Sequence, residues 1–560
     1  MQKTTFKPKF IAAFVALNLS SVAFAGQVYS GVDYQYFRDF AENKGKFTPG
    51  AQNIEVVNKK GESIGTMMQN APMIDFSVVS RNGVAALVGD QYIVSVAHNV
   101  GYSGVDFGME GSNPDQHRFG YNIVKRNNYK NDGTHPYMTD YHNPRLAKFV
   151  TEAAPIEMVS NMQGNTYGDL EKYPMRVRIG SGWQFLRDDN DNGNHIAMAY
   201  NYLTAGNTFM QGWANNGEVS LSGDVRHPNQ YGPLPISGSS GDSGSPMFIY
   251  DKTAGKWLLN GVLRSGHPYQ GKENTYQIAR KNYLDEIIAR DLVTVFEPTV
   301  ASYDWTADDN GKGKLTKGGS GGTDTPLANY SLASSGSDEA FGYGGPNPYM
   351  PALHHGKNIY FGNLENGTVT LKNNIDQGAG GLTFEGDFVV QPNADETWKG
   401  AGVSVSEGST VTWKIKNPAG DRLSKIGQGT LLVSGKGENL GDISVGDGVV
   451  VLNQQADEKG KKQAFNQLGI VSGRSTVKLE SADQVNPNNI YFGFRGGRLD
   501  LNGHSLTFNR IQNTDEGAQI VNHNKDAEST VKILGNAQIA DEKNINQSKA
   551  TAFNGWFGET

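Results

Sequence analysis

Short apolar runs separated by polar turns make up most of residues 26–300. Runs such as "MIDFSVVS", "VAALVGDQYIVSVAH" and "KWLLNGVLRSG" alternate or cluster over the length of single strands. One segment, "NYLDEIIARDL" at 282–292, has apolar residues at helical spacing and contains no helix breaker. The pattern therefore predicts a β-barrel or β-sandwich with a helix near its end.

The pattern changes from about residue 355 onward. Short strands headed by Gly or Ser-Thr recur there at intervals of roughly 20 to 30 residues, which is typical of stacked solenoid coils. A sandwich of hairpins, the alternative, would place its strands at about 8–12 residue intervals. We therefore expect a parallel β-helix over 355–560, joined to the first part by a polar, Gly-rich linker over 301–354. Examples of the strands are "GTVTL" (367–371), "STVTWKI" (409–415), "GTLLVSG" (429–435) and "GVVVLN" (448–453).

The first 25 residues have the three parts of a secretory signal peptide. Three lysines form a basic start, residues 10–22 are apolar, and "AFA" at 23–25 is a cleavage motif. The apolar run is too short for a transmembrane helix. The protein is therefore expected to be exported, with cleavage after Ala25.

Composition narrows the class of protein further. With 560 residues the chain is too long for one core, so at least two domains are expected. The net charge is −7 and no long basic run occurs, which argues against nucleic acid or an anionic membrane surface as the main partner. The chain has no cysteine, so an exported protein of this sequence must be stabilised by packing and β-sheet hydrogen bonds instead of disulfides.

The segment "GSSGDSGSPMFIY" at 238–250 places Ser243 in a glycine-rich turn before an apolar run. A serine becomes a strong nucleophile only when a base takes its proton and an acid orients that base. His98 is the best candidate base, because it ends the apolar strand "QYIVSVAH", where its position would be rigid. Asp140 is the strongest candidate acid, because apolar residues follow it closely in the chain.

Two segments contain metal-ligating residue types, but neither fits a common metal motif. His135, Asp140 and His142 are close in sequence, yet the spacing of the two histidines matches no common zinc motif. "DDNDNGN" at 188–194 resembles the first half of a calcium loop, with Ala199 where a bidentate Glu should stand. We predict a solvated turn at 188–194, and neither a metal nor another cofactor.

Several motifs are similar to those of known proteases. The order His, Asp, Ser, the "AH" after an apolar strand and "GDSGSP" resemble the chymotrypsin-like serine proteases. Longer motifs resemble the immunoglobulin A protease family of autotransporters, nearest to its adhesion and penetration protein type. They extend over essentially the whole chain and include "DYQYFRDFAENKGKFTPGAQNIEV", "PMIDFSVVSRNGVAAL", "YIVSVAHNVGY", "GDSGSPMFIYD" and "NGHSLTFNRIQNTDEGAQIVNHN".

The resemblance implies a charge-assisted catalytic triad. Ser243 would attack the scissile carbonyl, His98 would take and return the proton, and Asp140 would orient His98. Gly241 has no side chain to obstruct the substrate, so its N–H and that of Ser243 would form the oxyanion hole. Ser237 would lie at the base of the specificity pocket, where a neutral residue favours an apolar side chain over Lys or Arg.

One feature departs from the trypsin-like pattern. Those relatives order the acid before the nucleophile with a newly cut Ile or Val N-terminus. The mature chain here would begin with Gly26. Asp242 must therefore have another partner.

The resemblance also implies the architecture, function and location of the protein. The expected fold is all-β, with a chymotrypsin-like double β-barrel over 26–300 followed by a right-handed parallel β-helix. The chain would be the N-terminal part of an autotransporter passenger, truncated before the outer-membrane translocator barrel. It would pass through the periplasm and act at the cell surface or after secretion.

The expected activity is that of a serine endopeptidase without a cofactor. Its expected substrates are host extracellular proteins, such as immunoglobulin or matrix proteins, and autotransporter passengers including its own. The β-helix would add adhesion or self-association. The alternative is a surface adhesin whose protease only releases passengers. A polysaccharide-acting β-helix enzyme is a further alternative, but it would require clustered carboxylates, and no clear cluster is present.

Overall fold

The computed structural model describes most of the chain after the predicted signal peptide, which itself lies outside the described residues, as does His135. The described residues are 26–99, 102–108, 119–129, 140–238, 240–266, 272–295, 302–307, 313–317, 325–326, 331–333, 353–362, 366–493, 495–509, 511–513, 517–534, 552–553 and 555–558. Within them β-strands predominate and there are two α-helices, α1 (Tyr34–Glu42) and α2 (Lys281–Arg290). In this part of the chain neither helix has the length and apolarity needed to cross a bilayer.

Only one of the two helices was predicted from the sequence. α2 confirms the predicted helix near 282–292 and buries Leu284 and Ile287. α1 was not predicted, because its apolar residues are interleaved with charged ones. It begins where the Asp33 side chain accepts a hydrogen bond from the Gln35 N–H, and it buries Phe37 on its inner face.

Two antiparallel sheets form the predicted double β-barrel, which is confirmed. Among the described residues the first sheet has five strands and the second has seven. Both contribute to one continuous hydrophobic core. In spatial order the first sheet contains β4 (Ala86–Gly89), β5 (Tyr92–Val94), β8 (Arg145–Leu146), β7 (Tyr121–Lys125) and β6 (Gly104–Val105). The second contains β12 (Thr204–Asn207), β9 (Arg176–Gly180), β15 (Pro246–Asp251), β16 (Lys256–Gly266), β17 (Glu273–Ile278), β14 (Glu218–Ser222) and β13 (Met210–Asn215).

Smaller sheets lie beside the barrels. One contains, in spatial order, β1 (Gln27–Tyr29), β10 (Gln184–Arg187) and β11 (Gly193–Ala197). Another is the pair β2 (Ile54–Val57) and β3 (Ser63–Met67). β1 therefore places the first described residues next to the second barrel.

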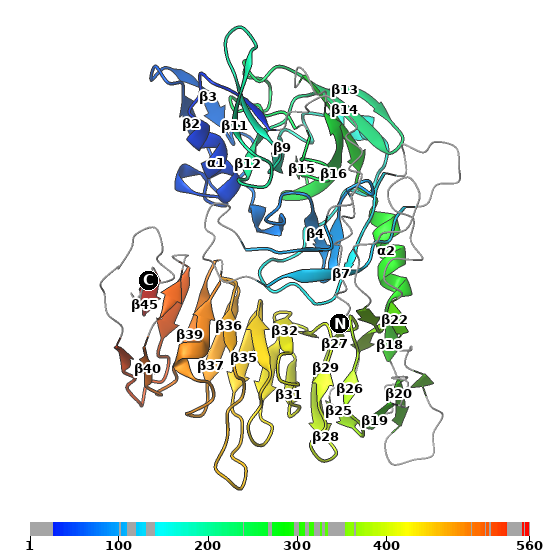
Figure 1. Cartoon of the computed structure of the whole chain (residues 1–560), viewed down its shortest axis with the longest axis vertical. Coiled ribbons are helices and arrows are strands. Elements are labelled where there is room, and N and C mark those ends of the chain that lie inside the picture. Colours follow the sequence, from blue (N-terminus) through cyan, green and yellow to red (C-terminus); the bar gives the residue numbers. More distant parts are fainter. Residues whose placement is uncertain are drawn as a thin grey trace, which may run out of the picture.

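The second half of the chain is a parallel β-solenoid, as predicted. Figure 1 shows its strands stacked side by side, yellow to red, below the blue-to-green barrels. In the described residues one long sheet contains β21 (Thr325–Pro326), β20 (Gly313–Lys317), β19 (Ser302–Ala307), β25 (Asn366–Leu371), β28 (Asp387–Pro392), β31 (Thr410–Trp413), β33 (Thr430–Val433), β35 (Gly448–Leu452), β37 (Ser475–Leu479), β39 (Gly497–Asp500), β42 (Ala518–Val521) and β45 (Trp556–Phe557).

A second solenoid sheet faces the first across the core. It contains β18 (Leu292–Val295), β24 (Asn358–Phe361), β27 (Leu382–Phe384), β30 (Val403–Val405), β32 (Arg422–Ile426), β34 (Asp442–Val445), β36 (Leu468–Ile470) and β38 (Ile490–Phe492). Four short strand pairs complete the described sheets: β22 (Ser331–Ala333) with β23 (Leu353–His355), β26 (Ile375–Asp376) with β29 (Trp398–Lys399), β40 (Leu506–Phe508) with β43 (Val531–Ile533), and β41 (Gln512–Asn513) with β44 (Ala552–Phe553).

Inward-facing aliphatic side chains form ladders along the solenoid. The register places Val411, Leu431, Val450, Val477 and Leu499 on successive neighbouring strands. All five are fully buried. Because every coil buries its side chains only against the next coils, the strand pattern repeats along the sequence.

The solenoid begins earlier than the predicted boundary at residue 355. β19 lies in the predicted linker, yet it pairs in parallel with β25 and buries Trp305 in the solenoid core. β18 likewise pairs in parallel with β24. We therefore propose that the solenoid starts directly after α2. The linker predicted over 301–354 missed β19 because polar, Gly-rich residues follow that strand. β18 ends before residue 300 and so fell inside the first predicted domain.

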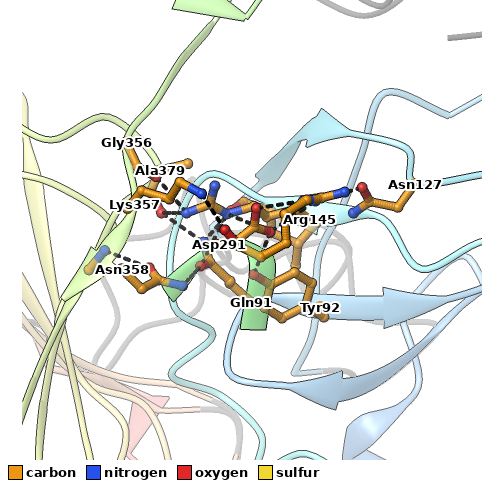
Figure 2. A network of polar contacts seen from close by, with 12 residues as sticks. Gln91, Tyr92, Asn127, Arg145, Asp291, Gly356, Lys357, Asn358 and Ala379 are labelled. Carbon is orange, nitrogen blue, oxygen red and sulfur yellow. Dashed lines mark hydrogen bonds and ion pairs between the residues drawn. The ribbon is translucent and has the colours of Figure 1, made fainter. Parts of the chain in front are cut away.

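A buried polar network joins the solenoid to the first barrel (Figure 2). Arg145 of β8 donates from Nη2 to the carbonyl oxygens of Gly356 (2.8 Å) and Ala379 (3.1 Å). Gln91 donates to the same Ala379 oxygen at 2.8 Å and accepts from the Asn358 amide at 2.7 Å. These donors satisfy backbone carbonyls of the first coils at their contact with β5 and β8.

We predict that Arg145→Met destabilises the whole protein by about 3 kcal/mol or more, because buried carbonyls of the first coils lose their donor and Asp291 loses one of its cationic partners. Differential scanning calorimetry of the full chain measures this change. The control is Arg474→Met, which removes a partly exposed ion pair with Asp447 (2.9 Å) and should cost less than about 1 kcal/mol. Equal effects of the two substitutions would contradict this role of Arg145.

Candidate active site

The segments that contain His98 and Asp140 are paired to each other beside the first barrel. His98 follows β5, and Asp140 precedes β8. The Ser95 N–H donates to the His142 oxygen (3.2 Å), and the His142 N–H donates back to the Ser95 oxygen (3.1 Å). This pairing holds the imidazole and the carboxylate at a fixed separation. Ser243 comes from the second barrel, in the turn before β15.

The structure brings the three predicted residues into one hydrogen-bonded line. His98 Nδ1 lies 2.6 Å from Asp140 Oδ2, and His98 Nε2 lies 2.7 Å from Ser243 Oγ. The other carboxylate oxygen accepts the His98 backbone N–H at 2.8 Å. An ionised Asp140 can only accept, so the imidazole proton belongs on Nδ1. Nε2 then presents a lone pair to the Ser243 hydroxyl, the arrangement in which histidine can act as a base.

Burial differs sharply between the acid and the base. The Asp140 side chain is fully buried, whereas the His98 side chain is 30% exposed. A buried carboxylate interacts with the imidazole through a low local dielectric, which strengthens the interaction. The exposed part of the imidazole leaves room for a substrate's leaving group.

The turn around Ser243 requires glycine on both sides of the nucleophile. Gly241 has φ +87° and Gly244 has φ +83°, the left-handed region that glycine adopts without strain. A Cβ on Gly244 would also lie 2.0 Å from Ser95 Oγ. Any larger residue there would push the first barrel away from the turn.

Two backbone N–H groups of this turn have no acceptor among the residues that the structure describes, unlike their neighbours. The N–H groups of Gly244 and Ser245 donate to Leu263 O and Asp242 O, each at 2.8 Å. Across the described residues, the N–H groups of Gly241 and Ser243 have no acceptor. Two such donors, one on the nucleophile residue itself and one two residues before it, form an arrangement that can bind an oxyanion.

Asp242 is paired with a cation of the barrel, a partner that the sequence alone did not identify. Its buried carboxylate lies 3.2 Å from the Nη2 atom of Arg178 on β9 and accepts the Gly182 N–H at 2.8 Å. The Gly26 nitrogen, which follows the expected cleavage position, donates at 3.3 Å. Burial opposes the charge of Arg178, but the Asp242 carboxylate outweighs it and raises the pKa of the guanidinium. The counter-charge for Asp242 thus comes from within the barrel.

Ser237 is fully buried. Its N–H and C=O pair with the backbone of Gln27, and its hydroxyl donates to Gly238 O at 3.2 Å. The Asn274 amide donates to the Ser237 hydroxyl at 3.3 Å. These hydrogen-bond partners carry no charge, and the pocket role of Ser237 stays a prediction.

Sequence reasoning missed two residues of this site. Asn99 donates to Ser243 O at 2.9 Å and so joins the histidine segment to the nucleophile turn. Arg178 was missed because "RVRIG" has the alternation of a half-exposed strand, whereas the structure buries Arg176 and Arg178 alike. For Asn99 the one signal in the sequence was its position directly after His98.

The second histidine of the segment has a structural role. His142 is buried, and its Nε2 atom forms a 2.7 Å hydrogen bond with the Tyr102 hydroxyl. Burial is the main cause that lowers the pKa of His142 well below its usual value, so the ring stays neutral at neutral pH. It supports the pairing between the His98 and Asp140 segments without a charge.

Metal-binding geometry is not found among the described residues. In them no three acidic or histidine side chains are placed to share an ion. In the 188–194 segment, Asp188 Oδ1 accepts the N–H groups of Asn190 (2.9 Å) and Asn192 (2.8 Å). These contacts define the turn between β10 and β11.

Comparison with known proteins places this geometry in a family. The family model described as immunoglobulin A1 protease matches residues 25–282, which include all three residues of the hydrogen-bonded line. Residues 25–282 form a domain that belongs to the immunoglobulin A1 protease family.

Relatives match the chain well beyond the family domain. The chain is 60% identical, over its full length, to 41% of an adhesion and penetration protein autotransporter of Haemophilus influenzae. It is 42% identical, over 97% of its length, to 34% of an immunoglobulin A1 protease autotransporter of the same species. A crystal structure of the Haemophilus influenzae Hap adhesin matches 95% of the chain and 58% of that chain, with a TM-score of 0.89 and 59% identity.

These matches confirm the predicted family and the predicted autotransporter passenger fold. The chain spans less than half the length of the curated relatives it matches. The part of each relative that the chain matches contains both the immunoglobulin A1 protease family domain and the solenoid.

We predict that Arg178→Met lowers the reactivity of Ser243 toward a fluorophosphonate by about 100-fold, the order of effect of losing an oxyanion donor. Asp242 would lose its cation, and the turn that holds the Gly241 and Ser243 N–H groups would relax. The measurement is the labelling rate of the full chain.

Arg176→Met is the matched control, because Arg176 is equally buried on β9 but donates to Tyr167 O and Gln211 instead. It should destabilise the fold and leave the labelling rate of the folded fraction within about threefold. The double variant Arg178→Met/Asp242→Asn, which buries no unpaired charge, should fold and still label slowly. If that variant is labelled as fast as the wild type, the proposed role of the ion pair is wrong.

Proposed function

We propose that this chain contains a serine endopeptidase that acts on proteins outside the cell. The supporting observation is the hydrogen-bonded line from the buried Asp140 through His98 to Ser243, inside a domain of the immunoglobulin A1 protease family. The export that the sequence predicts is consistent with relatives that are autotransporters.

In the proposed mechanism, His98 Nε2 removes the hydroxyl proton as Ser243 Oγ attacks the scissile carbonyl. Asp140 keeps the proton on Nδ1 and stabilises the imidazolium that forms. His98 then gives its proton to the leaving amine, and the acyl group stays on Ser243. A water molecule, activated by the same histidine, hydrolyses the acyl-enzyme.

Charge that develops on the carbonyl oxygen would be bound by the Gly241 and Ser243 N–H groups. These donors are held by the Asp242–Arg178 pair before substrate arrives, so little reorganisation is needed during the reaction. On the acyl side, the neutral surroundings of Ser237 favour an apolar residue over Lys or Arg, because nothing there would pair with a buried cation.

Adhesion or self-association is the second proposed role, and it belongs to the solenoid. The outer face of the long sheet presents a ladder of half-exposed side chains, among them Thr412, Leu432, Val451 and Lys478 in register. An extended face of this kind suits a binding surface. The related Haemophilus influenzae structure is described as an adhesin.

We predict that Ser243→Ala abolishes both fluorophosphonate labelling and peptide-bond cleavage, with a rate loss on the order of a million-fold. Wild type and variant are compared on a denatured protein mixture, with cut sites mapped by mass spectrometry. Adhesion of the variant to a protein-coated surface should equal that of the wild type. A folded wild type that neither labels nor cuts would overturn the protease proposal.

We also predict that Asp140→Asn lowers kcat about 10,000-fold, because an amide can donate to Nδ1 and so favours the wrong imidazole tautomer. Ester hydrolysis followed against pH measures this effect. A loss of less than tenfold in a folded variant would show that Asp140 does not orient His98.

A further inference from the structure

An exposed strand edge lies next to the candidate oxyanion hole. Within the described residues, β11 pairs only with β10, so its other edge has unpaired backbone donors and acceptors. Such an edge can add a further strand from another polypeptide. A segment of four alternate large apolar residues starts on β11 and continues into the loop that leads to β12.

This segment, residues 196–202, exposes an unusual amount of apolar surface. Ile196 is 39% exposed, Met198 57%, Tyr200 52% and Tyr202 37%. Single exposed apolar residues are common, but a contiguous group marks a binding surface. Four within one short segment therefore require an explanation.

The segment adjoins the nucleophile turn. A Cβ placed on Gly241 would lie 3.1 Å from the Cβ of Ala199 and 3.1 Å from the Cα of Gly182. Burial, and next the charge of Asp242, raise the pKa of the Tyr200 hydroxyl. The Ser237 side of the turn has different neighbours, namely Gln27 and Asn274.

An extended substrate must cross this turn with residues on both sides of the scissile bond. If Ser237 belongs to the acyl side, the 196–202 segment lies beside the leaving-group side. The segment is also held in shape before any ligand binds. Tyr200 has φ +66° and donates its N–H to Ser181 O at 2.5 Å, and the Arg38 guanidinium lies 4.4 Å from the Tyr202 ring centroid. Preorganisation lowers the cost of ordering a loop on binding.

We propose that β11 and the 196–202 segment bind the part of the substrate that follows the scissile bond. The ligand is an extended polypeptide that pairs with the β11 edge and places large apolar side chains on Met198 and Tyr200. This inference rests on the proposed endopeptidase function and specifies its substrate class: chains with apolar residues on the leaving-group side.

The test compares the wild type with Met198→Ser/Tyr200→Asn on a mixture of denatured peptides. Asn adopts positive φ readily, so the second substitution suits the backbone at 200. Met210→Ser is the matched control, because Met210 is a similarly exposed methionine on β13. The readout is the ratio of cuts followed by large apolar residues to cuts followed by small polar ones, since a general loss of activity cancels in a ratio.

The wild type and Met210→Ser should share a ratio well above one, and the double variant should lower it about tenfold, the effect expected of an apolar subsite. The preference on the acyl side serves as an internal reference. An unchanged ratio in an actively cutting double variant would overturn this inference alone. A wild type that neither cuts nor labels would overturn the proposed function, and this inference with it.

Discussion

Two fully buried carboxylates organise the candidate site, because a buried carboxylate must receive hydrogen bonds or a counter-charge. Asp140 receives two hydrogen-bond contacts from one residue, His98, and so fixes both the position and the tautomer of that ring. Asp242 receives a guanidinium and two backbone N–H groups, and so fixes the turn next to it. The neighbouring residue in that turn is Ser243, which places the nucleophile and its oxyanion donors against the ring.

The same requirement governs how the two halves of the chain meet. There is no cysteine, so no disulfide can hold the barrels to the solenoid. Arg145 and Gln91 instead satisfy buried carbonyls of the first coils. Arg145 lies on β8 and Gln91 lies in the turn before β5. The segments next to these two strands contain Asp140 and His98. The immunoglobulin A1 protease family domain and the start of the solenoid therefore form one packed unit.

The residues of the hydrogen-bonded line were predictable because each has a distinctive local context. His98 ends an apolar strand, Ser243 stands in a glycine-rich turn, and apolar residues follow Asp140. The solenoid was predictable from the strands of its long sheet, which alternate inward and outward residues. Most strands of the facing sheet were missed, because they have only three or four residues and their partners lie in neighbouring coils. The exception is β27, which lies in the predicted strand "GLTFEG" at 381–386.

Other features depended on contacts that no local pattern encodes. Arg178 is paired with a residue far along the chain, and alternation alone would have exposed it. β19 was hidden by polar residues around it, although Trp305 is buried in the solenoid core. The apolar segment at 196–202 has the composition of a buried strand, and only the fold shows that it faces solvent.

The most direct test of the central claim is a crystal structure of the protein after reaction with a peptidyl phosphonate. We expect one covalent bond, to Ser243 Oγ, with a phosphonyl oxygen within about 3 Å of the Gly241 and Ser243 N–H groups. His98 Nε2 should remain within hydrogen-bond distance of the adduct. Modification of another residue, or an adduct whose oxygen points to solvent away from that turn, would show that Ser243 and its turn do not have the proposed roles.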